Sequence, residues 1–144
     1  MPAPSVWGPI LWGVLHGVGF RSGKGPVSTA IDERREVTWL IKHLEDVIPC
    51  RECRTHVAKF KKQVVFEVSG VGPWIWKLHE SVNERLGKAS VTFTPDIGSG
   101  VNIRQSWKIY LNSLHESVLT GSVKGSCLKD FNHHVGLWAG FAGV

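Results

Sequence analysis

The chain has 144 residues, the usual length of one domain and enough to bury a core without disulfide cross-links. Lysine and arginine number 17 against 12 acidic residues, a net charge of +5, and 42% of residues are hydrophobic, which excludes an intrinsically disordered chain. Three cysteines are too few for the dense cross-linking of a small secreted scaffold, and their odd number leaves at least one without a partner in the chain.

Residues 1–20 carry no formal charge and could be mistaken for a signal peptide or a membrane span. No basic residue precedes the apolar stretch, and prolines, glycines and a histidine interrupt it, so we reject both interpretations. We therefore expect no membrane association and a reducing, cytoplasmic location. In such a compartment a Cys-x-x-Cys pair is more often redox-active or metal-binding than structural.

Hydrophobic side chains recur at helical spacing in the first half of the chain. They predict a first helix over residues 7–20, followed by a glycine-containing loop over 21–27. A second helix then runs to about Pro49, and residues 29–32 at its start have the pattern of a capping box. Its apolar face consists of Val37, Leu40, Ile41, Leu44 and Ile48.

Pro49 separates the second and third predicted helices, because proline disfavours helix at the preceding residue and suits the first turn of a new one. The third helix therefore carries Cys50 and Cys53 at its N-terminus. Residues 64–68 form a β-branched run too short for a sheet, so we expect an extended loop. Pro73 opens a fourth helix, which Gly87 ends.

The remainder of the chain is less regular. Residues 91–100 are expected to be a linker and 103–119 a further helix, and frequent glycines leave the tail beyond it without a predicted structure. The predicted fold is all-α, with a four-helix bundle in a domain of residues 1–100 and a C-terminal extension over 101–144.

The pentapeptide Leu-His-Glu-Ser-Val occurs twice, at residues 78–82 and 114–118. The flanking residues differ, since Trp76 aligns with Asn112 and Asn83 with Leu119. We therefore interpret the recurrence as coincidence rather than as a duplicated ligand-binding helix.

Cys50 and Cys53 are the first candidates for chemistry. Two cysteines three residues apart at a helix N-terminus can form a disulfide, and the free N–H groups there stabilise a thiolate. The same predicted helix is strongly basic, with Arg51, Arg54, Lys59, Lys61 and Lys62 against Glu52. Three alternatives remain: a redox pair, a zinc site with His56 and Cys127 as further ligands, or a chance pair on a solvated basic face.

Two further pairs lie four residues apart and so share a helix face: Trp12 with His16, and His79 with Asn83. Each residue alone is more often a satisfied polar or core side chain. Together they could form a flat slot with polar edges, which suits a planar heteroaromatic ligand.

The order and spacing of these motifs resemble the Erv/ALR family of flavin-linked sulfhydryl oxidases. The motifs are Trp-Gly-x-x-x-Trp-x-x-Leu-His from residue 7, Pro-Cys-x-x-Cys-x-x-His from residue 49, and a fourth-helix motif from Trp74 to Lys88. The chain is most similar to the short forms of nucleocytoplasmic large DNA viruses, which form disulfides in the host cytosol. This resemblance implies FAD bound in the bundle by residues drawn from Gly8, Trp12, His16, Trp74, His79, Val82, Asn83, Leu86 and Lys88.

The resemblance also implies different roles for the two cysteines. Cys53 would lie nearer the flavin ring, and Cys50 would exchange with the incoming dithiol. The chain departs from the family at Glu80, where Asn is usual, and in lacking a second Cys-x-x-Cys. For Cys127 three roles remain: an idle thiol, which we favour, a bridge across a dimer, or a mobile shuttle in a flexible segment.

We therefore expect an FAD-dependent thiol oxidase that forms disulfides in protein dithiol substrates, reduces molecular oxygen to hydrogen peroxide and acts as a homodimer. The alternative is a zinc-stabilised interaction or nucleic-acid-binding domain without catalysis. The lysine and arginine residues of this chain cluster around the cysteine pair instead of forming a long stripe, which argues against a nucleic-acid-binding function.

Overall fold

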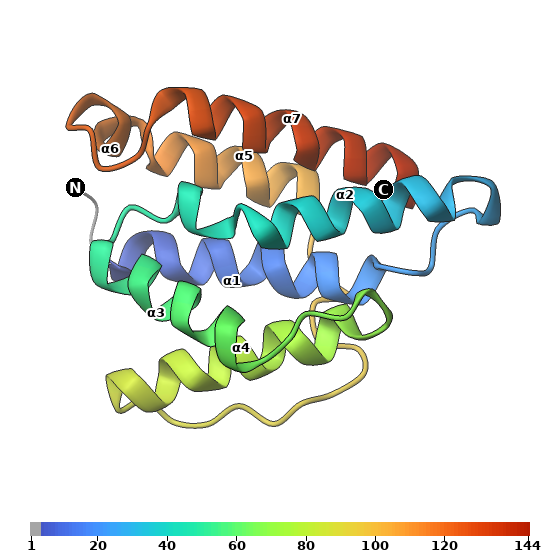
Figure 1. The fold of residues 1–144 in the computed structure, drawn as a ribbon, viewed down its shortest axis with the longest axis horizontal. Helices are drawn as coiled ribbons and strands as arrows, with labels where there is room; N and C mark the ends of the chain where they lie inside the picture. The colour runs from blue at the N-terminus through green and yellow to red at the C-terminus, as the bar shows by residue number, and fades with distance from the viewer. Residues whose placement is uncertain (1–3) are drawn as a thin grey trace.

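The computed structural model describes residues 4–144, and all regular structure within that range is helical (Figure 1). The predicted all-α fold is therefore confirmed. None of the helices of residues 4–144 is long and apolar enough to cross a membrane. The α-helices are α1 (Pro4–Arg21), α2 (Ala30–Lys42), α3 (Arg51–Gln63), α4 (Val71–Leu86), α5 (Ile103–Ser113), α6 (His115–Leu119) and α7 (Gly125–Ala142). Short 3₁₀ turns lie at η1 (Val27–Thr29), η2 (Leu44–Val47) and η3 (Val68–Gly70).

The first, third and fourth helices lie where periodicity and the prolines predicted them, and two details of the second are corrected. Its α-helical part ends at Lys42, because His43 leaves helical geometry (φ −107°, ψ 13°) and a 3₁₀ turn completes the path toward Pro49. The predicted capping box is absent at its start. The hydroxyl of Thr29 instead donates to the carbonyl of Phe141, 2.7 Å away near the end of α7.

The C-terminal part also differs from expectation. The helix predicted over 103–119 is interrupted at Leu114, which gives α5 and α6. The glycine-rich tail, which had no predicted structure, forms the long helix α7. Its glycines Gly136 and Gly140 lie on the exposed side, whereas a regular apolar face is buried at Phe131, Val135, Trp138, Ala139 and Ala142.

The helices pack in pairs around one core. α7 packs along α2, and α5 and α4 pack against α1, while α3 contacts α4 (Figure 1). Trp138 and Tyr110 are completely buried and belong to the same core as the apolar residues of α1 and α2. The C-terminal helices thus share the core of the bundle, and the boundary at residue 100 stays a prediction.

The segment between α4 and α5 returns along the outside of α4 and crosses α1 (Figure 1). At the crossing Gly98 has a positive φ of 86°, and a side chain there would collide with the backbone of His16. Only glycine combines this backbone conformation with so close an approach. The crossing therefore lies directly over one of the predicted site residues.

The turn before the cysteine pair is held from two sides. Tyr110 on α5 donates its hydroxyl to the carbonyl of Val47 at 2.6 Å, and burial raises the pKa of Tyr110. Arg54 on α3 donates to the carbonyls of Ile48 at 2.7 Å and of Ser122 at 3.0 Å. The C-terminal half of the chain therefore fixes the backbone that leads into Cys50.

We predict that Tyr110→Phe lowers the free energy of unfolding by about 1–3 kcal/mol, because it leaves the buried Val47 carbonyl without its donor. Urea denaturation measures the change. Thr38→Ala is the control, since its hydroxyl bonds a carbonyl on the exposed side of α2, and it should cost less than about 0.5 kcal/mol. Equal losses in the two variants would contradict the role given to Tyr110.

Candidate functional site

The cysteine pair lies at the N-terminus of α3, as the sequence predicted. Cys50 and Cys53 form a disulfide, with their Cα atoms 5.1 Å apart. Cys50 is the N-cap residue, and its Sγ accepts a hydrogen bond from the backbone N–H of Cys53 at 3.2 Å. Both cysteines are half-buried, so a partner thiol can reach the bond while the helix N-terminus favours a thiolate.

Arg85, in the last turn of α4, contacts the disulfide from a different helix. Its Nη2 lies 3.7 Å from the Sγ of Cys53. The sequence did not predict this contact, because only the basic residues of the third predicted helix were considered as neighbours of the cysteines. The signal available was the position of Arg85 on the helix that already carried His79 and Asn83.

His56 lies one turn after Cys53 and bonds across to α4. Its Nε2 is 2.8 Å from the hydroxyl oxygen of Ser81. Burial lowers the pKa of His56, and the charges of Arg85 and Lys59 lower it further. The imidazole is therefore neutral at pH 7, and Arg85 is the cation in contact with the sulfur.

Trp12, His16 and His79 form an aromatic cluster between α1 and α4. The rings of Trp12 and His79 are stacked, with centroids 4.0 Å apart and planes 9° apart. The Nε2 of His16 is 2.9 Å from the Nδ1 of His79, so one ring donates and the other accepts. The structure thus brings together three residues that sequence analysis assigned to one slot.

The environment keeps both of these histidines neutral. Burial, and then the neighbouring His79, lower the pKa of His16 to about 4, and burial also lowers the pKa of His79. The Nδ1 of His16 is buried and has no hydrogen-bond partner among the described residues. A buried polar atom of this kind carries a desolvation cost that a bound polar group would remove.

The C-terminal half of α4 borders a cavity of about 470 Å³, lined among others by Asn83, Lys88 and Glu80. Gly87 ends the helix with a positive φ of 68°, and the backbone N–H of Lys88 bonds the carbonyl of Asn83 at 2.8 Å. This C-cap turns the chain so that Lys88 and Asn83 line the same cavity.

Glu80, the departure from the family pattern, fastens the segment after α4. Its carboxylate accepts from the backbone N–H of Val91 at 2.8 Å and from the hydroxyl of Ser90. These hydrogen bonds lower the pKa of Glu80. The indole N–H of Trp76 donates to the carbonyl of Val91 at 2.7 Å, so two side chains of α4 hold the same residue.

The other predicted binding residues have different surroundings. Trp74 is buried, donates its indole N–H to the carbonyl of Val64 at 3.0 Å and packs against two phenylalanines, so it holds the extended loop after α3. Leu86 is exposed, while Gly8 and Val82 are half-buried on α1 and α4.

The alternative zinc site is not assembled. His56 is directed to Ser81, and no group of three or more metal-ligating side chains that could hold an ion occurs among residues 4–144. Cys127 lies in the first turn of α7, after the buried Val123, and not in the flexible segment that a shuttle would need. The structure therefore gives no support to a mobile arm.

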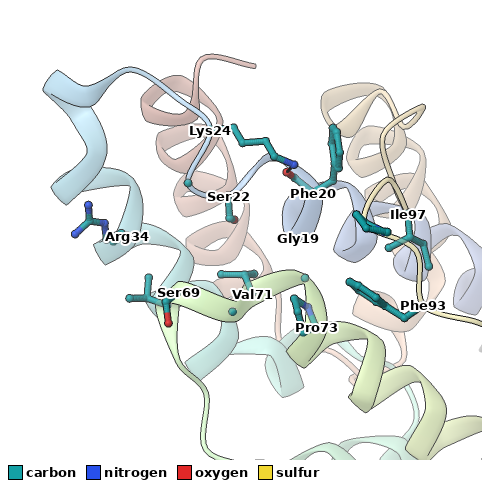
Figure 2. Close-up of a pocket in the computed structure, with 15 residues that line it drawn as sticks. Gly19, Phe20, Ser22, Lys24, Arg34, Ser69, Val71, Pro73, Phe93 and Ile97 are labelled. Atoms are coloured by element: carbon teal, nitrogen blue, oxygen red, sulfur yellow. Dashed lines mark hydrogen bonds between the residues drawn. The ribbon is translucent and has the colours of Figure 1, made fainter.

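A second cavity, of about 480 Å³, lies where α1 ends and α4 begins (Figure 2). Arg34 and Ser69 face Phe93 and Ile97 across it. The ammonium of Lys24 on its wall is already engaged, 2.7 Å from the carbonyl of Phe20 and 3.4 Å from the centre of its ring. None of the predicted site residues lines this cavity, so the disulfide and its neighbours locate the candidate site at the other end of these helices.

Residues 9–109 match the sequence model of the Erv1 / Alr family, a span that contains the cysteine pair and the aromatic cluster. The chain belongs to the Erv1/Alr family. A protein of Frog virus 3 (isolate Goorha) that carries the name FAD-linked sulfhydryl oxidase 088R is 33% identical over 94 residues. The alignment covers 62% of each chain, so this chain spans less than two thirds of that relative's length. No solved structure matches the present chain significantly.

Membership of the Erv1/Alr family confirms the resemblance drawn from the motifs. The matched span reaches into α5 and leaves α6 and α7 outside it. The second Leu-His-Glu-Ser-Val pentapeptide lies across the break between α5 and α6, where His115 is exposed. His115 therefore has the local sequence of His79 without its surroundings, which makes it a matched control.

We predict that the free energy of unfolding falls as the pH drops from 6.5 toward 4. Because burial lowers the pKa of folded His16 to about 4, the unfolded chain binds more protons in this interval, and the loss should reach up to about 3 kcal/mol. His16→Gln keeps a polar side chain and should reduce this pH dependence, measured by urea denaturation, while the lowered pKa values of His56 and His79 leave a smaller slope. His115→Gln should keep the wild-type slope, and a slope as steep as that of the wild type in His16→Gln would show that other groups cause it.

Proposed function

We propose that this chain is an FAD-dependent thiol oxidase that forms disulfides in protein substrates and passes the electrons to molecular oxygen, giving hydrogen peroxide. The observation that carries the proposal is the placement of the disulfide. It lies at the N-terminus of α3 in contact with Arg85 of α4, the helix that also carries His79 and Asn83. Family membership and the name of the viral relative support the same activity.

The residues present fit a flavin nucleotide. The flat, stacked rings of Trp12 and His79 suit a planar aromatic ligand, and the buried, unpartnered Nδ1 of His16 lacks a polar neighbour that a ligand could supply. The cavity along α4 is lined by the amide of Asn83 and the ammonium of Lys88. We expect FAD to be held by Trp12, His16, His79, Val82, Asn83 and Lys88.

The protein's own chemistry is thiol–disulfide exchange. A substrate thiolate attacks the Sγ of Cys50, a new sulfur–sulfur bond forms, and the Cys50–Cys53 bond breaks to release Cys53 as a thiolate. A second substrate thiolate then attacks the mixed disulfide and releases Cys50, so the substrate loses two electrons and the pair gains them. When bound, FAD supplies the two-electron acceptor that restores the disulfide and that oxygen reoxidises.

The proposal includes a homodimer acting in the cytoplasm of an infected host cell, as expected from the resemblance to viral members. α5 already covers one side of α1, and α7 covers α2. A homodimer of this chain would therefore use surfaces that these two helices leave open. Light scattering coupled to gel filtration measures the mass that tests it.

We predict that Trp12→Ala and His79→Ala each weaken FAD retention. Both variants lose stacking area, and His79→Ala also loses the hydrogen bond to His16. Losing one such bond corresponds to about five- to a hundredfold in affinity. The bound flavin is measured from its visible spectrum after gel filtration, with His115→Ala as the control that should remain yellow. Full FAD occupancy in both variants would show that Trp12 and His79 do not bind the flavin. A colourless wild-type protein that releases zinc would favour the non-catalytic alternative.

We predict different defects for the two cysteine variants. Cys53→Ser should stay yellow when a dithiol is added without oxygen, because the thiolate that would reduce the flavin is missing. Cys50→Ser should show a long-wavelength absorption band, because Cys53 remains as a thiolate beside the flavin ring. A band in Cys53→Ser and none in Cys50→Ser would reverse the two assignments.

A further inference from the structure

The two sulfurs of the disulfide lie in different electrostatic surroundings. The Sγ of Cys50 accepts the backbone N–H of Cys53, so the α3 N-terminus stabilises charge on it. The Sγ of Cys53 lies one turn into the helix, where the guanidinium of Arg85 is 3.7 Å away. Each sulfur therefore has its own positive group, one a partial helix charge and the other a full cation.

Arg85 is the group that can supply that charge at any working pH. A guanidinium stays protonated throughout the physiological range, whereas His56, one turn after Cys53 on α3, is kept neutral because burial and the charges of Arg85 and Lys59 lower its pKa. Ser81 of α4, which carries no charge, is hydrogen-bonded to His56. The guanidinium of Arg85 would thus stabilise a negative charge on the Sγ of Cys53.

We propose that Arg85 is a catalytic residue that stabilises Cys53 as the leaving thiolate and so directs the attacking substrate to Cys50. This inference rests on the proposed thiol oxidase function. When the substrate thiolate bonds to Cys50, the electron pair of the broken sulfur–sulfur bond moves to Cys53, and a leaving thiol of higher acidity departs faster. The same contact keeps Cys53 in the thiolate form, which is the form that donates electrons.

The test measures the thiolate of Cys53 directly. In a Cys50→Ser, Cys127→Ser background Cys53 is the only thiol left, and mass spectrometry follows its alkylation by iodoacetamide from pH 5 to pH 9. Arg85→Gln should slow alkylation about three- to tenfold on the acidic side of the profile, a moderate change because Arg85 is exposed, and leave the rate at high pH unchanged. Arg85→Lys should restore most of the rate.

Arg51→Gln is the matched control, because it removes the same charge from an exposed residue next to Cys50. It should shift the profile less than Arg85→Gln. An unchanged profile in Arg85→Gln, or an equal shift in Arg51→Gln, would overturn the inference, the second outcome by assigning the effect to overall charge. Circular dichroism checks that each variant is folded.

The alkylation profile needs neither flavin nor turnover, so its failure is separate from a failure of the proposed function. If Arg85 has no effect, the yellow colour and its bleaching by a dithiol still test the oxidase. If the protein binds no flavin, the profile still shows whether Arg85 acts on Cys53. In an active oxidase, Arg85→Gln should also slow the anaerobic bleaching by a dithiol while leaving FAD occupancy unchanged.

Discussion

The geometry of the site depends on how two backbone carbonyls before the cysteine pair are held. The carbonyl of Val47 accepts a hydrogen bond from the hydroxyl of Tyr110, and the carbonyl of Ile48 accepts one from the guanidinium of Arg54. The carbonyls of a turn that leads into a helix have no hydrogen-bond partners inside the helix. If the turn is buried, side chains must supply the donors, because an unpaired buried carbonyl destabilises the fold. Here one donor comes from α5 and the other from α3, and together they fix where α3 begins and therefore where Cys50 caps it.

Desolvation shapes the aromatic cluster in the same way that hydrogen bonding shapes the turn. Burial disfavours the charged form of His16 and His79, and the neighbouring His79 lowers the pKa of His16 further. The two imidazoles are therefore a neutral pair beside the indole of Trp12, while the cation of the site, Arg85, lies at the disulfide. The neutral aromatic cluster and the charged contact to the sulfur thus lie at different points along α4.

Periodicity and prolines were enough to predict α1, α3 and α4, because apolar faces and helix boundaries are local properties of the sequence. α7 was missed because its glycines outweighed the regular spacing of Phe131, Val135 and Trp138, although Gly136 and Gly140 lie on the exposed side where they disturb no packing. Motif spacing also predicted that the cysteine pair starts α3 and that Trp12, His16 and His79 lie together, as the structure shows. Arg85 could not be found that way, because its contact with Cys53 joins residues 32 positions apart through the packing of α3 on α4.

The part of the chain that follows the family match is joined to the site by hydrogen bonds as well as by the core. The family match ends at residue 109, yet Tyr110 bonds Val47, and the carbonyl of Ser122, just before α7, accepts from Arg54. Arg54 is adjacent to Cys53 in the first turn of α3, so one guanidinium connects the start of α7 to the helix that carries the disulfide. α7 in turn is fixed along α2 by its buried apolar face and by the bond from Thr29 to Phe141. The C-terminal helices therefore act as part of the support of the cysteine pair, because a shift of α7 would remove an acceptor from Arg54 and loosen the turn that this residue holds.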